Sequence, residues 1–145
     1  MKLTVEQIAP AEPEEILVRC HNVEQPWVKA VQCAAAGQVT VNGVSDGRLY
    51  RLKLDEIYYF EVVDGASFLY GRKEVFSCKL KLYEFEALCS GTMLFRCSKS
   101  LVLNADKIDY IRPSLSGRFE AVLENGEKVI VSRQYVADLK RLLGV

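Results

Sequence analysis

The sequence predicts a mainly β protein of the α+β class, in which short antiparallel strands outnumber a few short helices. Hydrophobic residues make up 50% of the 145 residues, and they alternate with polar ones over short stretches, as in strands with one buried face. Four dipeptides that tolerate positive φ angles separate these stretches, as tight hairpins require: Asn42-Gly43, Asp46-Gly47, Asp64-Gly65 and Asn125-Gly126. Many short strands with brief helices are typical of a β sandwich or roll rather than of a helix-turn-helix domain.

Residues 1–45 are predicted to form a small β-β-α extension. A helix should begin at Pro26, which fits the first helical turn, and end at Gly37, which accepts a positive φ angle. A unit of this size cannot bury both of its faces, so it must dock on the rest of the chain or on another copy. The expected strands are 2–8 and 15–20, and the apolar residues with helical spacing are Trp27, Ala30, Val31 and Ala34.

Residues 46–145 are predicted to form the main domain. Its clearest hairpin joins residues 118–124 to 127–132, because apolar and polar residues alternate on both sides of Asn125-Gly126. Apolar stripes at helical spacing predict two helices, at 79–89 and 133–143. The other expected strands are 48–53, 56–63, 67–71, 74–77, 94–97, 101–103 and 108–112.

The charge of the chain is balanced, with 19 basic and 19 acidic side chains. Residues 1–45 have two net negative charges and residues 46–145 have two net positive charges. Because a nucleic-acid-binding domain usually has a basic excess, composition by itself does not suggest DNA. If the chain binds DNA, its basic residues must gather on one edge, and binding must depend steeply on salt.

The sequence lacks the features of secreted, membrane-inserted and enzymatic proteins. No run of about 20 apolar residues could cross a membrane, and the N-terminus does not resemble a signal peptide, so we expect a cytoplasmic protein. Five widely spaced cysteines without a C-x-x-C pair indicate neither a disulfide scaffold nor a metal site. The single histidine, His21, has no nucleophile partner, and there is no phosphate-binding glycine-rich loop. We therefore expect no catalysis, no cofactor and no small-molecule substrate.

Four segments along residues 48–143 carry a resemblance to a known family. They are Asp55–Glu61 with Asp64-Gly65; Leu82–Glu86; Phe95–Ser100 with Leu101–Asn104 and Ile108; and Asn125–Glu127 with Val131–Tyr135. In this order they resemble the LytTR DNA-binding domain. The resemblance implies an elongated stack of short antiparallel β-sheets. It also implies a transcription regulator that binds paired DNA half-sites as a dimer, through loops that enter the major groove. Residues 1–45 are too short for the receiver domain that many family members carry.

The resemblance also implies three positions that face double-stranded DNA. The first is near Ser67, the second is the loop from Arg96 to Ser100, and the third is Arg133. The family often has His-Arg where this chain has Ser98-Lys99. Since lysine cannot make the bidentate contact of arginine, Lys99 is expected to hold phosphate more than to read a base.

The chemistry of these residues suits DNA, with an alternative at each position. The guanidinium of Arg133 can reach guanine O6 and N7 together; otherwise Arg133 is a surface arginine paired with an acid such as Asp138. Two cations and two hydroxyl groups within residues 96–100 suit phosphates. Otherwise this segment is a solvated strand end, in which Arg96 turns inward to a partner such as Glu61.

Four further residues carry separate expectations. Arg72 and Lys73, at a hairpin tip, could touch phosphate if that tip lies on the binding edge. Asn104 is predicted to be structural, because an asparagine at a strand end usually hydrogen-bonds its own turn. Cations beside Cys97 would lower the pKa of its thiol and allow a redox switch; the alternative is a half-buried strand residue.

The alternative function is a non-catalytic protein–protein interaction module, which zero net charge and an aromatic-rich β domain would also suit. We further expect residues 1–45 to form or support a homodimer contact, since an apolar helix is attached to too small a sheet. A basic edge that holds Lys99, Arg133 and Arg72 would favour DNA. An uncharged apolar patch would favour a protein partner.

Overall fold

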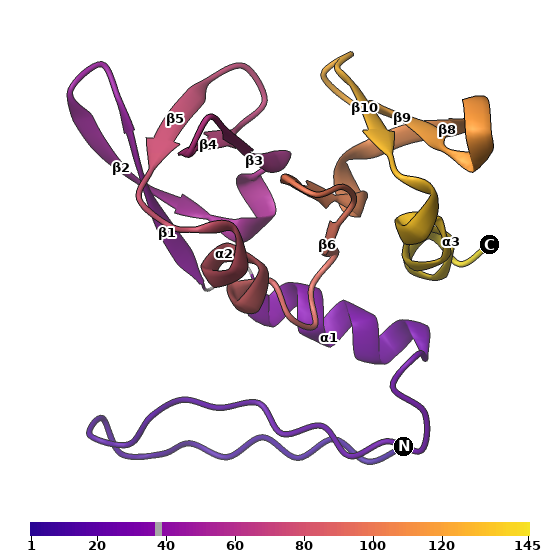
Figure 1. The fold of residues 1–145 in the computed structure, drawn as a ribbon. Helices are drawn as coiled ribbons and strands as arrows, with labels where there is room; N and C mark the ends of the chain where they lie inside the picture. Colours follow the sequence, from indigo (N-terminus) through magenta and orange to yellow (C-terminus); the bar gives the residue numbers. More distant parts are fainter. Residues whose placement is uncertain (37–38) are drawn as a thin grey trace.

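The computed structural model describes residues 1–36 and 39–145, which form a seven-stranded and a three-stranded antiparallel sheet. Figure 1 shows the sheets side by side, with α2 beneath the larger sheet, α3 beneath the smaller one, and α1 running below both. The expected helix end at Gly37 lies outside the described residues. The α-helices are α1 (Pro26–Ala36), α2 (Leu82–Leu88) and α3 (Val136–Leu143).

The larger sheet has the strand order β2-β1-β5-β4-β3-β7-β6, and the smaller has the order β10-β9-β8. The mainly β class is confirmed, and every strand expected between residues 48 and 131 is present with small shifts at its ends. The strands are β1 (Thr40–Ser45), β2 (Arg48–Lys53), β3 (Tyr59–Val63), β4 (Ala66–Tyr70), β5 (Val75–Cys78), β6 (Leu94–Arg96), β7 (Leu101–Asn104), β8 (Ile108–Pro113), β9 (Phe119–Leu123) and β10 (Lys128–Val131).

Two of the predicted turns are two-residue hairpins of the expected kind. Asp46 and Gly47 have φ angles of 51° and 72° between β1 and β2, and Asp64 and Gly65 have 50° and 78° between β3 and β4. Two successive positive φ angles match the right-handed twist of the flanking strands. The first of these turns places the predicted domain boundary, between residues 45 and 46, inside the β1–β2 hairpin.

The expectation of a turn at Asn42-Gly43 is wrong, because both residues lie inside β1. A Cβ atom on Gly43 would lie 2.7 Å from the Cβ of Phe76 on the neighbouring strand β5. Glycine is therefore needed here for the close approach of two strands and not for a positive φ angle. The sequence signal was real, but a dipeptide does not reveal which of these two reasons requires the glycine.

Two hydrophobic cores hold the sheets and helices together. In the first, between the larger sheet and α2, the rings of Phe60 and Phe85 stack with centroids 4.4 Å apart. In the second, Leu103 of β7 and Val131 of β10 pack with Leu139 of α3, so β7 joins the smaller sheet to the larger one. Both helices predicted in residues 46–145 are confirmed, although the first turn of the second, Arg133–Tyr135, is a 3₁₀ turn.

The two strands expected at 2–8 and 15–20 do not form. Residues 1–20 follow an extended path without strand pairing, and only one backbone hydrogen bond, Glu12 N–H to the Ala9 carbonyl, occurs among them. Their alternating apolar pattern is that of a strand, but a strand needs a ladder partner, and the described part of the chain supplies none.

The predicted helix is confirmed as α1, but its buried face differs from the expected one. Val28 is 4% exposed, whereas Ala30 and Ala34 of the expected stripe face solvent. An alanine-rich helix has weak amphipathicity, so its spacing is compatible with more than one buried face.

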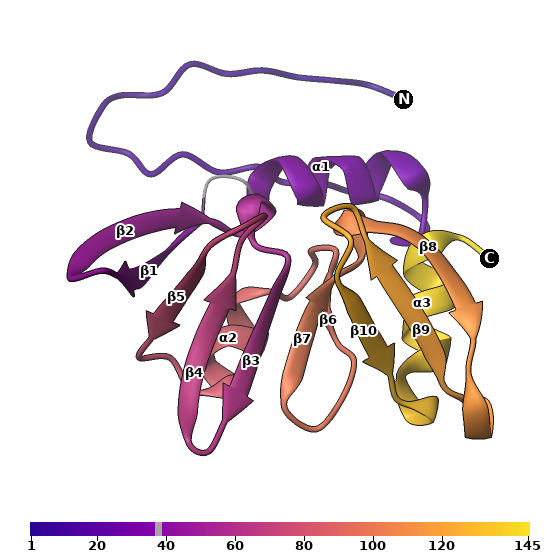
Figure 2. The ribbon, with the colours of Figure 1, turned by 90° about the horizontal axis from the view of Figure 1, so that it is seen from above.

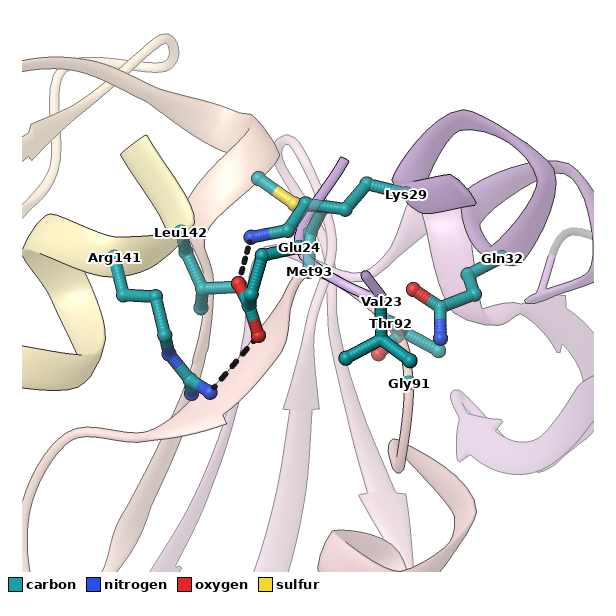
Figure 3. A pocket seen from close by; sticks show the side chains of 9 residues that line it. All are labelled: Val23, Glu24, Lys29, Gln32, Gly91, Thr92, Met93, Arg141 and Leu142. Atoms are coloured by element: carbon teal, nitrogen blue, oxygen red, sulfur yellow. Dashed lines mark ion pairs between the residues drawn. The ribbon is translucent and has the colours of Figure 1, made fainter. Parts of the chain in front are cut away.

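Helix α1 docks on its own chain through an ionic contact with the end of α3. Glu24, just before α1, lies 2.8 Å from Lys29 Nζ and 3.7 Å from Arg141 Nη1 (Figure 3). The hydrogen bond from Lys29 holds the pKa of the Glu24 carboxyl below its ordinary value, although the group is solvent-exposed. The residues 91–93 of the α2–β6 loop complete this junction around a cavity of about 160 Å³.

The close approach at Gly43 leads to a first prediction. Gly43→Ala should lower the free energy of unfolding by about 1–3 kcal/mol, because the added methyl must displace Phe76 in a packed core. Gly71→Ala is the matched control, since its Cβ would meet the same ring at an ordinary 3.7 Å, and it should change stability by less than about 0.5 kcal/mol. Urea unfolding measures both; equal effects of the two substitutions would contradict the packing explanation.

Candidate nucleic-acid interface

The strand directions bring four connecting segments to one edge of the molecule. Glu61 of β3 pairs with Leu101 of β7 near the ends of those strands, so the β3–β4 turn and the β6–β7 loop share an edge. Phe119 pairs with Val131 at the corresponding ends of the smaller sheet. Figure 2 shows these connections along the lower side of the view. We call this side the loop edge; it comprises residues 64–65, 97–100, 115–118 and 132–134.

Arg96 holds the β6–β7 loop in shape from inside. Its Nε donates to the carbonyl of Ser98 at 2.6 Å, its Nη2 donates to the carbonyl of Lys99, and its Nη1 donates to Glu86 Oε2 at 3.1 Å. All three guanidinium nitrogens are thus engaged by the chain itself. Arg96 turns inward, as one alternative allowed, but its acidic partner is Glu86 of α2 and not Glu61. It positions the loop and does not project from it.

A backbone hydrogen bond joins this loop to the segment that carries Arg133. The N–H of Ser132 donates to the carbonyl of Cys97 at 2.9 Å. Arg133 follows directly and is exposed. Its expected alternative partner, Asp138, pairs instead with Arg141 at 3.3 Å. The two predicted cationic positions, Lys99 and Arg133, therefore lie on one edge of the molecule.

The stem of Arg133 is supported by the β8–β9 loop. A Cβ atom on Gly117 would lie 2.8 Å from Arg133 Cδ, and Gly117 has a φ of 74°. Both facts require glycine, since a side chain would clash and would also be strained. The preceding Ser116 has a φ of 60°, which bends the loop back so that Arg118 faces the same space.

These segments enclose an open groove of about 670 Å³ in which three cations from three loops meet. Lys99, Arg118 and Arg133 are all exposed, and among the described residues none of them forms an ion pair. Among the described residues no acidic side chain lines the groove, so the charged groups there are all basic although the whole chain is neutral. The other lining residues are polar: Ser98, Ser100, Ser116, Ser132 and Gln134.

The sequence interpretation did not name four residues that line the groove: Arg118, Ser116, Ser132 and Gln134. A signal for Arg118 was available: the first strand of the predicted hairpin begins at residue 118 and the second ends at residue 132, so these two ends lie together, and in the structure Phe119 pairs with Val131. Arg118 therefore had to lie beside Ser132 and Arg133. Ser116 and Gln134 carried no comparable signal.

Three predicted residues lie elsewhere. Ser67 is half-buried in β4, near the β3–β4 turn, and does not line the groove. Arg72 and Lys73 form the β4–β5 turn at the opposite ends of the strands from the loop edge. There Asn125 Nδ2 donates to the Arg72 carbonyl at 2.9 Å, which ties the tips of two hairpins together. The condition for phosphate contact, a tip on the binding edge, is therefore not met by Arg72 and Lys73.

Two other residues have structural surroundings. The Asn104 side chain accepts from Asp106 N–H at 3.0 Å, which confirms the predicted bond to its own turn, and donates to the Ile57 carbonyl at 2.8 Å. Burial raises the pKa of the Cys97 thiol to about 12, and this outweighs the opposite effect of Arg96. Burial therefore has a larger effect on the pKa of this thiol than the neighbouring cation, and the lowered pKa expected for a redox switch is not found.

The part of the chain that the structure describes has neither a metal site nor a membrane-spanning helix. No group of three or more His, Cys, Asp and Glu side chains is arranged to hold a metal ion. Within residues 1–36 and 39–145, no helix has the length and apolar character needed to cross a membrane.

The fold and the groove together define a class of protein. Unpaired cations surrounded by hydroxyl and amide groups suit a polyanion that offers many phosphate oxygens. Loops at one edge of a rigid β body can present those groups to a duplex groove. The molecule is thus a β-rich nucleic-acid-binding domain.

Comparison with known proteins identifies the family. Residues 47–144 match the model of the LytTr DNA-binding domain, so the chain belongs to the LytTR DNA-binding domain family, as the four sequence segments indicated. The chain is 29% identical over 100 residues to the sensory transduction protein LytT of Enterococcus faecalis. It is 30% identical over 105 residues to the transcriptional regulatory protein YpdB of Escherichia coli K12.

The matches cover 69% and 72% of this chain, and the chain spans 41% and 43% of the lengths of these relatives. Among solved structures, the LytTr DNA-binding domain of a Bacillus cereus protein is similar, with a TM-score of 0.69 and 27% identity. That match covers 75% of this chain and 100% of the solved one.

The role of Arg96 leads to a second prediction. Arg96→Ala should lower the free energy of unfolding by about 1–2 kcal/mol, since it removes charge-assisted hydrogen bonds at a half-buried site. It should also speed amide exchange in residues 97–100. Arg112→Ala is the matched control, because Arg112 is an exposed residue of β8 that pairs with Glu120 of β9; it should cost less than about 1 kcal/mol. Unchanged exchange in the loop would show that Arg96 does not hold it.

Proposed function

We propose that this chain is a sequence-specific, DNA-binding transcriptional regulator. In this proposal its loop edge enters the major groove, and two copies bind paired half-sites. The observation that carries the proposal is the groove of Lys99, Arg118 and Arg133, where three unpaired cations from three loops face the same space. Such an arrangement is costly without an anion, because like charges repel, and a DNA backbone relieves the repulsion.

The three cations suit different tasks. Lys99, at the tip of a short loop, is a flexible point charge for a phosphate. Arg133 is exposed at its guanidinium end and supported along its stem by Gly117, so it can make a directed bidentate contact with a guanine edge. Arg118 lines the same groove, and an arginine can bind phosphate through one or two hydrogen bonds. The neighbouring serine hydroxyls and Gln134 add neutral partners for phosphate or adenine.

The neutral net charge of the chain does not oppose this proposal. Acidic residues are kept out of the groove, and several of them neutralise cations elsewhere, as Glu24 does at Arg141 and Glu86 does at Arg96. Because electrostatic attraction to DNA acts over about 8–10 Å at physiological salt, the local charge of the loop edge matters more than the total charge.

Selection of bound fragments from genomic DNA at near-physiological salt tests the proposal directly. The wild-type chain should enrich a recurrent sequence with two half-sites about 10 base pairs apart, or a multiple of this, as a dimer on one face of the helix requires. The combined variant Lys99→Ala, Arg118→Ala and Arg133→Ala should enrich nothing. A wild-type chain that enriches no sequence would overturn the proposal of specific binding.

A third prediction concerns Arg133. Arg133→Ala should weaken specific binding by about 1–3 kcal/mol and relax the preference at one base pair, the effect of losing one bidentate contact. Its melting temperature should barely change, since the side chain is exposed. Arg72→Ala, an exposed arginine at the opposite edge, is the control and should leave affinity unaltered. If folding suffers while DNA affinity holds, Arg133 is structural.

A fourth prediction concerns Lys99. Lys99→Ala should weaken binding to specific and non-specific DNA by a similar factor. It should also reduce the slope of log affinity against log salt by about 1, because one phosphate contact is lost. Lys73→Ala should leave the slope as it is. Fluorescence anisotropy at several salt concentrations measures both, and an unchanged slope for Lys99→Ala would remove this residue from the phosphate contacts.

A further inference from the structure

Residues 1–20, which we call the arm, have the composition of a strand and no strand beside them. Leu3 is 87% exposed, Leu17 is 75% exposed and Ile16 is 65% exposed. The described chain gives the arm one internal backbone hydrogen bond and none to the sheets. A segment with exposed apolar side chains and unpaired backbone groups is suited to pairing with the edge of a sheet.

Strand β2 is an edge of this kind. It is the outermost strand of the larger sheet, so one side of its backbone is unpaired within the described residues. Leu49, the second residue of β2, is 67% exposed, and its cross-strand neighbour Val44 is 40% exposed. Arg48, Arg51 and Lys53 are exposed on the same strand, and the described part of the chain offers them no ion pair. The β2 edge therefore presents one exposed apolar side chain, Leu49, together with three cations.

The arm and the β2 edge are complementary in charge, hydrophobicity and length. The arm has Glu12, Glu14 and Glu15 directly before its apolar run Ile16–Val18. Strand β2 has three cations interleaved with apolar residues over six positions, and residues 15–20 cover the same length. Pro13, which cannot donate to a ladder, lies before this stretch, where a proline is tolerated.

Helix α1 separates the arm from the β2 edge of its own chain. Figure 1 shows α1 between the arm and the two sheets, with β2 on the far side of α1. The ionic contact of Glu24 with Lys29 and Arg141 holds the start of α1 against the end of α3. Since α1 is anchored in this way, the arm stays on the outer side of α1, where a neighbouring molecule could meet it.

We propose that the arm of one copy adds as an extra strand to the β2 edge of a second copy, and that the exchange is reciprocal. Each pair of copies then buries two equivalent contacts, as closed two-fold symmetry requires. Glu15 and the acidic residues before it then lie beside the cations at one end of the β2 edge, and the apolar run Ile16–Val18 lies along the edge that carries Leu49. The contact lies away from the loop edge (Figure 2). This inference rests on the proposed function, because it supplies the dimer that paired half-sites require.

Charge reversal tests the exchange in a way that does not depend on the strand register. The arm variant carries Glu12→Lys, Glu14→Lys and Glu15→Lys, and the edge variant carries Arg48→Glu, Arg51→Glu and Lys53→Glu. In sedimentation velocity, each variant alone should dimerise at least about tenfold more weakly than the wild type, since each opposes like charges at both contacts. Mixed in equal amounts, they should form a heterodimer as readily as the wild type forms its homodimer. Of the samples that contain a variant, only the mixture lets each arm meet an edge of opposite charge, as in the wild type.

The control variant is Tyr83→Asp, which adds a charge at an exposed position of α2, outside the arm and the β2 edge. Tyr83 is 68% exposed, as much as Leu49 of the β2 edge at 67%. This variant should dimerise like the wild type. Persistent dimers of both variants, failure of the mixture to dimerise, or a wild-type chain that stays monomeric would each overturn the exchange. Binding to DNA with a single half-site separates the two proposals. If variant monomers bind it, the proposed function stands whatever the dimer does. If the wild type does not bind it while the mixture restores dimers, the proposed function fails and the exchange stands.

Discussion

The whole loop edge depends on how the chain holds two loops together without neutralising their charge. The hydrogen bond from Ser132 N–H to the Cys97 carbonyl joins the loops, and Arg96 fixes the shape of one of them by donating to its carbonyl groups. Neither interaction uses the charged ends of Lys99, Arg118 or Arg133. The exposed cations Lys99, Arg118 and Arg133 are therefore held at one edge and remain available to an external anion.

The two sheets hold these loops in fixed positions because hydrogen bonds join the sheets at both edges. At the loop edge, the Cys97 carbonyl connects the end of β6 to the end of β10. At the opposite edge, Asn125 connects the β9–β10 turn to Arg72. Between these points, the second core packs Leu103, Val131 and Leu139 without solvent. A packed core transmits position between loops that are far apart in sequence, so cations from three loops can form one surface.

Elsewhere on the surface, charged residues are also either paired within the chain or left exposed. Acidic residues pair with cations away from the groove, as Glu24 does where α1 meets α3. The β2 edge keeps its own unpaired cations, and these face the side from which an acidic arm could approach. A neutral chain can thus present two basic surfaces, one for a duplex and one for a second copy. Their separation on the molecule would let both be occupied together.

The sequence by itself determined the class of fold, most strand positions and two of the groove cations. These depend on local rules: a period of two marks a strand, Asp-Gly permits two positive φ angles, and Lys99 and Arg133 lie in recognisable family segments. Only the tertiary structure decided what each side chain meets. It showed that Gly43 serves close packing, that Arg96 turns to Glu86, that Arg118 enters the groove, and that Arg72 and Lys73 lie at the far edge. It also showed that residues 1–20 have no ladder within the described chain. The reason is physical: a strand, a cation or a glycine has its effect through a partner brought close by folding, and that partner is distant in sequence.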